Sequence, residues 1–170
     1  ILVFWLLPTN LLFFLFIGSS LFAQDEKIDL GEREYQNIDG KNYTLESQFK
    51  AKGLIVIFSC NTCPFVVGND DFAGWEKDYN KLYDMASELE IEIVLVNSNE
   101  GKRDGDDSFS EMEAHAKEQG YKMKYLLDKN SELANRLGAK TTPHIFFFNG
   151  DSQLVFTGSI DNSWDSKRNE

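Results

Sequence analysis

The amino-acid sequence predicts an α/β fold in which helices flank a mixed central β-sheet. Three observations indicate this class. The run GLIVIFS at 53–59 is apolar over the length of a strand, which is typical of a strand buried on both faces. Segments with strand and helix periodicity alternate after it. Two strand-like segments then close the chain around a Gly150-Asp151 turn, which predicts an antiparallel hairpin.

The first half of the chain begins with a hairpin and a strand. Two short alternating runs at 33–45 flank Asp39 and Gly40, a pair that favours a tight turn. The apolar strand 53–59 follows. Apolar residues then recur every three or four positions over 64–90, which predicts one long amphipathic helix. The apolar face of this helix is expected to contain Phe72, Trp75, Tyr79, Leu82, Tyr83, Ala86 and Leu89.

The second half continues the alternation of strand and helix. The segment 91–99 has a strand pattern and precedes a loop at 101–107 that is rich in Gly and Asp. A helix is expected from Ser108, which forms a Ser-x-x-Glu capping box with Glu111, to Gly120. The remaining expected elements are a strand at 124–128, a helix at 130–139 and strands at 144–149 and 153–160.

Length and charge restrict the function. A chain of 170 residues is long enough for one domain with a full core and too short for two domains that each have one. Its composition, 42% hydrophobic and 14% aromatic, is that of a globular protein. The net charge of -11 argues against a nucleic-acid partner, because such a surface cannot neutralise a row of phosphates.

The first 23 residues resemble a secretory signal in composition. Residues 1–23 carry no charge and end in small residues, which predicts cleavage after Ala23, although no initiating Met or basic segment precedes them. An uncleaved membrane anchor is the alternative, but Pro-Thr-Asn at 8–10 leaves fewer than the roughly 20 apolar residues that a span needs. We expect a mature domain at 24–170 that is periplasmic or secreted, without stable membrane insertion.

Both cysteines, Cys60 and Cys63, stand in one Cys-x-x-Cys motif after the apolar strand. A structural zinc site needs four ligands, and His115 and His144 form no second pair at ligand spacing. Covalent haem needs a His where Pro64 stands. A structural disulfide closing so short a loop would constrain the unfolded chain little. Redox chemistry without a metal or cofactor is what remains.

The expected position of the pair predicts unequal roles. Cys60 is expected at the end of a buried strand, over free backbone N–H groups at the start of a helix, where thiolate is favoured over thiol. We therefore expect Cys60 to be the more exposed thiol, to have the lower pKa and to attack a substrate disulfide. Cys63, with its sulfur turned toward the protein, would resolve the mixed disulfide.

Four stretches resemble a known family in their order along the chain. FSCNTCPFV, IEIVLVNSN, YLLD and the segment from LGAKTTPHIFFFN onward look like thioredoxin-like proteins of the peroxiredoxin-like group, the alkyl hydroperoxide reductase/thiol-specific antioxidant or redoxin family. The likeness runs from about Ile28 to the C-terminus. It implies a thioredoxin-like fold, a cis bond before Pro143 and pairing of the Thr142 backbone with substrate. It also implies one more C-terminal helix than this sequence contains.

Departures from the family pattern favour one of its activities. Its peroxidases resemble one another in a Pro-x-x-x-Thr-x-x-Cys element that helps to bind peroxide. Counting back from Cys60 gives Ile57 and Gly53, and counting back from Cys63 gives Cys60 and Val56. Neither count fits, so dithiol–disulfide exchange is favoured over a hydroperoxide mechanism.

A second departure concerns the proton of the resolving thiol. Thioredoxins keep a buried Asp six residues before the first cysteine, and Leu54 stands there in this chain. The proton is expected to pass to water or to a carboxylate such as Asp70 or Asp71, and the sequence leaves this choice open.

The other candidates have simpler interpretations. His144 at the start of a strand is more often a packed or surface residue than a catalytic one, and His115 on an amphipathic helix is expected to be solvated. Trp75 is expected in the core unless it borders the active site. The acidic loop with Asp104, Asp106 and Asp107 lacks the spacing of a calcium-binding EF-hand and is interpreted as a flexible loop.

The sequence therefore favours an exported thiol–disulfide oxidoreductase, with Cys60 and Cys63 as catalytic residues and Thr142 and Pro143 in contact with substrate. Two alternatives stay open. One is a peroxiredoxin-like thiol peroxidase with Cys60 as the peroxidatic thiol, and the other is a binding module whose thiols form only a structural clip. The expected partners are protein or small-molecule thiols and disulfides, together with a reductase or oxidant of unknown identity.

Overall fold

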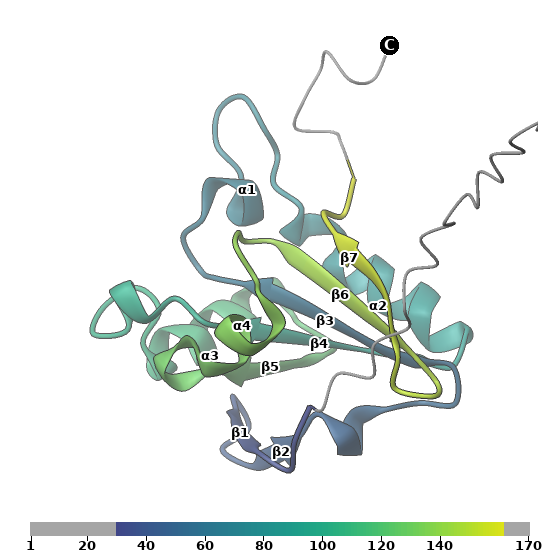
Figure 1. The fold of residues 1–170 in the computed structure, drawn as a ribbon. Coiled ribbons are helices and arrows are strands. Elements are labelled where there is room, and N and C mark those ends of the chain that lie inside the picture. Colours follow the sequence, from purple (N-terminus) through teal and green to yellow (C-terminus); the bar gives the residue numbers. More distant parts are fainter. Residues whose placement is uncertain (1–29, 162–170) are drawn as a thin grey trace, which may run out of the picture.

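Seven strands form one mixed sheet in the part of the chain that the computed structural model describes, residues 30–161 (Figure 1). The strands are β1 (Glu34–Asn37), β2 (Asn42–Thr44), β3 (Gly53–Ser59), β4 (Ile91–Asn97), β5 (Lys124–Leu127), β6 (His144–Asn149) and β7 (Leu154–Gly158). Their order across the sheet is β2-β1-β5-β4-β3-β6-β7. The central strands β3, β4 and β5 are parallel, and the outer pairings are antiparallel. The predicted α/β class is confirmed.

Helices cover both faces of this sheet. They are α1 (Pro64–Val67), α2 (Tyr79–Glu88), α3 (Phe109–Gln119) and α4 (Glu132–Leu137), with 3-10 turns η1 (Glu46–Gln48), η2 (Glu76–Asp78), η3 (Glu100–Lys102) and η4 (Lys129–Ser131). Because side chains alternate along a strand, neighbouring residues of β4 enter different cores. Leu95 packs with α1, α2 and α3, whereas Val94 and Val96 pack with α4 on the other face.

Several local predictions are confirmed. The Asp39-Gly40 turn joins β1 to β2, and the Gly40 N–H donates to the carbonyl of Asn37 at 2.8 Å. Strand β3 is almost entirely buried. Helix α3 has Ser108 as its N-cap, whose hydroxyl accepts from the backbone N–H of Glu111, and Gly120, in the left-handed conformation, as its C-cap. These features depend on neighbouring residues, which explains why the sequence predicts them well.

The prediction of a single helix over 64–90 is wrong. The chain forms the short helix α1, leaves it at Gly68 and becomes helical again only at η2 and α2. Gly68 and Gly74 have φ values of +91° and +72°, a conformation that L side chains rarely adopt. A Cβ at Gly74 would lie 2.4 Å from the carbonyl oxygen of Val66, so the loop packs closely on α1. Leu89, expected in the core, is 63% exposed.

The predicted signal at 1–23 and the last residues, 162–170, lie outside the described part of the chain. Within 30–161, no helix combines the length and the apolar character that a membrane span requires.

Candidate active site

Strand pairing brings the Cys-x-x-Cys motif and Thr142 together. Cys60 directly follows β3, and Thr142 lies just before β6. The two strands are antiparallel neighbours with Phe58 opposite His144, so the end of β3 meets the beginning of β6. The peptide bond between Thr142 and Pro143 is cis, as expected. The four residues predicted for the site therefore lie at one edge of the sheet.

Both sulfurs contact the same residue. The Sγ of Cys63 lies 3.1 Å from the carbonyl oxygen of Thr142, to which its S–H donates. The Sγ of Cys60 lies 3.4 Å from the Thr142 hydroxyl oxygen. Both cysteines are free thiols, so this geometry belongs to the reduced protein.

An open cleft of about 540 Å³ borders the thiols. Both cysteines and Thr142 line it, and residues after β4 and along α4 form its other side. Polar residues of the lining include Thr62, Ser98, Asn99, Ser131, Asn135 and Thr141. A volume of this size accommodates a small ligand or a short segment of a peptide.

The predicted order of exposure of the two thiols is wrong. Cys60 is only 3% exposed because it packs into the core between the sheet and α1 to α3. Cys63 is partly exposed at the rim of the cleft, where it immediately precedes α1. The helix begins at Pro64, after the second cysteine, so Cys60 does not occupy the exposed first turn that the spacing suggests.

The predicted order of pKa values is also reversed. The interaction of the two thiols lowers the pKa of Cys63 and raises that of Cys60. Burial raises the pKa of Cys60 further and partly opposes the lowering at Cys63. The Thr142 hydroxyl and the backbone N–H groups of Phe65 and Val66 also lower the pKa of Cys63. Ionisation of the pair therefore favours a thiolate on Cys63.

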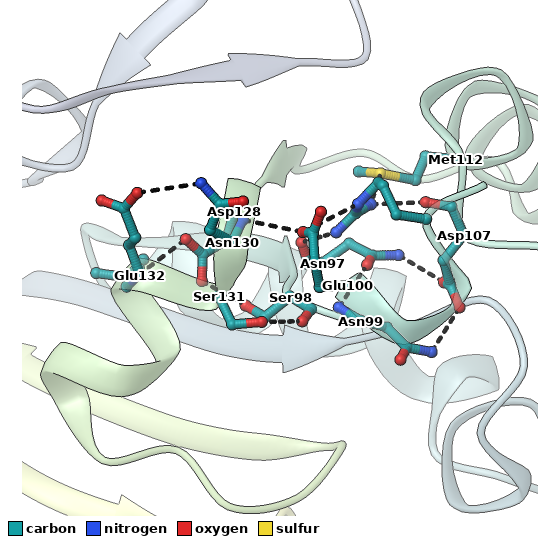
Figure 2. A network of polar contacts seen from close by, with 12 residues as sticks. Asn97, Ser98, Asn99, Glu100, Asp107, Met112, Asp128, Asn130, Ser131 and Glu132 are labelled. Atoms are coloured by element: carbon teal, nitrogen blue, oxygen red, sulfur yellow. Dashed lines mark hydrogen bonds and ion pairs between the residues drawn. The ribbon is translucent and has the colours of Figure 1, made fainter.

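The acidic loop before α3 is anchored at the motif, contrary to the interpretation as a flexible loop. Asp107 is fully buried, and its Oδ1 accepts from the backbone N–H of Asn61 at 2.8 Å. Figure 2 shows the side-chain amides of Asn97 and Asn99 converging on the same carboxylate, at 2.6 and 2.7 Å. These residues were not predicted from the sequence because the contact between Asp107 and Asn61 spans 46 positions.

The carboxylates considered as proton acceptors lie apart from the thiols. Asp70 and Asp71 are exposed on the loop after α1, and neither lines the cleft. Leu54, at the position of the thioredoxin aspartate, is fully buried in the apolar core on the α4 side. Trp75 is also buried and does not line the cleft.

The two histidines have structural contacts. His144 accepts from the backbone N–H of Lys140 at 3.2 Å, and its other ring nitrogen lies 3.1 Å from the Thr157 hydroxyl, consistent with a packed residue. His115 is not simply solvated, as was expected, because it contacts the buried carboxylate of Glu76. Among residues 30–161, no group of three or more His, Cys, Asp or Glu side chains is arranged to hold a metal ion.

Several solved structures are similar to this chain over most of its length. An uncharacterized conserved protein from Geobacillus kaustophilus is 28% identical, with a TM-score of 0.70, over 80% of this chain and 71% of that one. A hypothetical protein from Sinorhizobium meliloti is 25% identical, with a TM-score of 0.70, over 79% and 70%. A secreted disulfide oxidoreductase from Mycobacterium tuberculosis shares the fold, with 13% identity and a TM-score of 0.57 over 81% and 90%.

No curated protein matches the chain in sequence. The family model described as Redoxin matches residues 26–170, which is most of the chain. The chain also shares its fold with solved structures described as thioredoxin-like proteins, which agrees with this match. The chain belongs to the redoxin family.

Proposed function

We propose that this protein is a thiol–disulfide oxidoreductase in which Cys60 and Cys63 exchange electrons with substrate disulfides. One observation carries the proposal: two free thiols contact the same residue, Thr142, in the wall of an open cleft. A pair that served only as a structural clip would have no need of such a cleft. Membership of the redoxin family is consistent with this chemistry.

The exchange would take two steps. The Cys63 thiolate attacks one sulfur of a substrate disulfide, forming a mixed disulfide and releasing the first substrate thiolate. Cys60 then loses its proton to the released thiolate, directly or through water, and attacks the Cys63 sulfur. This step forms the Cys60–Cys63 disulfide and releases the second substrate thiolate, which takes a proton from water. The protein dithiol loses two electrons and the substrate disulfide gains them, and the reverse sequence oxidises a substrate dithiol.

The assignment of Cys63 as the attacking thiol replaces the order expected from the motif. An attacking thiol needs access to substrate and a stabilised thiolate. Cys63 has the greater exposure and the lowered pKa, whereas Cys60 is buried and has a raised pKa. Cys60, held beside Cys63, is suited to resolve the mixed disulfide.

Thr142 would contact the substrate in the cleft, and Pro143 lies directly behind it in the chain. Thr142 lines the cleft between the two thiols and the beginning of β6, so a substrate segment seated there would lie against its backbone. Pro143 is buried and cannot donate a backbone hydrogen bond. Candidate substrates are protein or small-molecule thiols and disulfides, with a separate reductase or oxidant to restore the starting state.

We also propose that the domain is exported. The uncharged residues 1–23 support export. An oxidising compartment outside the cytoplasm would suit either direction of electron flow, since thiol–disulfide proteins there act as oxidants or as reductants.

Reduction of insulin disulfides by the dithiothreitol-reduced domain tests the proposed function. We expect turnover that is lost in both Cys60→Ser and Cys63→Ser. Hydrogen peroxide should be consumed little faster than by a free thiol, because the chain lacks the peroxidase Thr and Pro. Rapid turnover of peroxide with no reduction of insulin would favour the peroxidase alternative. Inactivity in both assays would favour the binding module.

A further inference from the structure

The peptide unit that leaves Cys60 is held by a buried carboxylate. The N–H of Asn61 belongs to the peptide bond that joins it to Cys60, and it donates to Asp107 at 2.8 Å. This contact fixes the backbone on one side of the Cys60 side chain. Cys63 is held differently, through backbone N–H groups at the start of α1.

The side chain of Asn61 is held at both ends. Its amide oxygen accepts from the Tyr125 hydroxyl at 2.9 Å, and its amide nitrogen donates to the carbonyl oxygen of Asp106 at 2.8 Å. Asn61 is thereby tied to β5 and to the loop before α3, in addition to its backbone contact with Asp107. Such a set of contacts leaves this residue little freedom to turn.

Asp107 is itself fixed from several sides. Its carboxylate, a hydrogen-bond acceptor when ionised, receives donors from Asn61, Asn97 and Asn99 and is fully buried. Arg103 donates to the backbone carbonyls of Asp107 at 2.6 Å and of Asn97 at 3.0 Å, which joins the loop to the end of β4. Burial removes water from the carboxylate, so its oxygens need these protein donors in place of hydration.

We propose that Asp107 and Asn61 are positioning residues that hold Cys60 at the distance and angle needed to attack a mixed disulfide on Cys63. This inference rests on the proposed function and extends it. The side-chain hydrogen bonds of both residues go to groups other than the reacting sulfurs, and both residues act through the backbone of Cys60. A resolving thiol held in place reacts at a much higher effective concentration than a free one.

The two steps of exchange should respond differently to loss of this clamp, formed by Asp107 and Asn61. Attack by Cys63 depends on its exposure and on the groups around its sulfur, which the clamp does not contact. Resolution depends on the position of Cys60, which the clamp holds through Asn61. A general loss of structure would instead expose both thiols, change both steps and lower stability.

Dithiobis(nitrobenzoate) separates the steps because each releases one coloured thiolate. In rapid-mixing experiments with the reduced protein, we expect Asp107→Ala to keep the first release within about twofold of the unmodified protein and to slow the second at least about tenfold. Asp106→Ala is the matched control. It removes a neighbouring exposed carboxylate that pairs with Lys102, and keeps the carbonyl that Asn61 contacts, so both releases should be unchanged.

Asn61→Ala guards against misfolding of the buried variant. It removes the contacts with Tyr125 and Asp106 but keeps the backbone N–H, so we expect the second release to slow by about threefold or more in a variant that urea unfolding shows to be folded. The inference would be overturned if the second release in Asn61→Ala and in folded Asp107→Ala stayed within about twofold of the rate in the unmodified protein. It would also be overturned if both releases slowed equally. No second release in the unmodified protein would instead count against the proposed function.

Discussion

The hydroxyl oxygen of Thr142 lies 3.4 Å from the sulfur of Cys60, although 82 positions separate the two residues in the chain. The contact exists because β6 runs antiparallel to β3 and begins where β3 ends. The same residue contacts Cys63 through its carbonyl oxygen, so Thr142 touches both reacting groups. Its hydroxyl can donate to whichever sulfur is ionised.

Thr142→Val should weaken the thiolate. Contact with the Cys60 thiol lowers the pKa of Cys63 most, and the Thr142 hydroxyl adds to this lowering. Valine keeps the shape of the side chain and removes the donor, so the pKa of Cys63 should rise by about 0.5 to 1. The rate of iodoacetamide modification against pH measures it. Thr141→Val, a change at the exposed neighbour, should leave the profile unaltered; equal profiles for the two variants would contradict the role of Thr142.

The two cysteine variants should trap substrate unequally. If Cys63 attacks and Cys60 resolves, Cys60→Ser should accumulate a mixed disulfide that survives until external thiol is added, and Cys63→Ser should trap little. Mass spectrometry after mixing with a disulfide peptide gives the two yields, and we expect a ratio of about tenfold or more. Greater trapping by Cys63→Ser would restore the order expected from the motif alone.

His115 should make stability depend on pH. Its hydrogen bond with Glu76 raises the pKa of the imidazole, so the stabilisation is complete below the unfolded value of about 6.5 and is lost as pH rises through the folded pKa. In urea unfolding, the advantage of the unmodified protein over His115→Gln should therefore be larger at pH 6 than at pH 9. A tenfold gain in the proton affinity of the folded imidazole would add about 1.4 kcal/mol to this difference.

His144→Gln is a useful comparison for this measurement. Burial lowers the pKa of His144, so its protonation opposes folding and its contribution is lost as pH falls. The advantage of the unmodified protein over His144→Gln should be smaller at pH 6 than at pH 9. The same sign of pH dependence in both variants would show that the Glu76 contact does not control His115.

Gly74→Ala tests the loop that interrupts the predicted long helix. A Cβ at this position would lie 2.4 Å from the backbone of Val66, and the residue has a φ of +72°. We expect destabilisation by at least about 2 kcal/mol in urea unfolding, from backbone strain and the displacement of α1. At Gly101 no heavy atom lies within 4 Å of an added Cβ, so Gly101→Ala should change stability by less than about 0.5 kcal/mol. Similar changes in the free energy of unfolding for both variants would mean that the loop adjusts to an added Cβ at little cost.

Features that depend on adjacent residues were predictable from the sequence. The apolar run of β3, the turn at Gly40 and the capped start of α3 at Ser108 each follow from local composition and backbone preference. The Cys-x-x-Cys spacing likewise indicated the chemistry of the pair. The resemblance to the redoxin family added the position of Thr142 and Pro143, and the cis bond there is confirmed.

Features that depend on distant contacts were decided by the tertiary structure. Periodicity over 64–90 could not reveal that the backbone turns at Gly68, because a folded loop and a helix can both bury residues at such spacing. The motif could not show which thiol is covered, since the core that buries Cys60 is assembled from three helices and the sheet. The role of Asp107 was hidden for the same reason. Its carboxylate reaches Asn61 only when the loop before α3 packs against the end of β3. Asp107 is buried by this packing of distant segments, which no local pattern in the sequence reports.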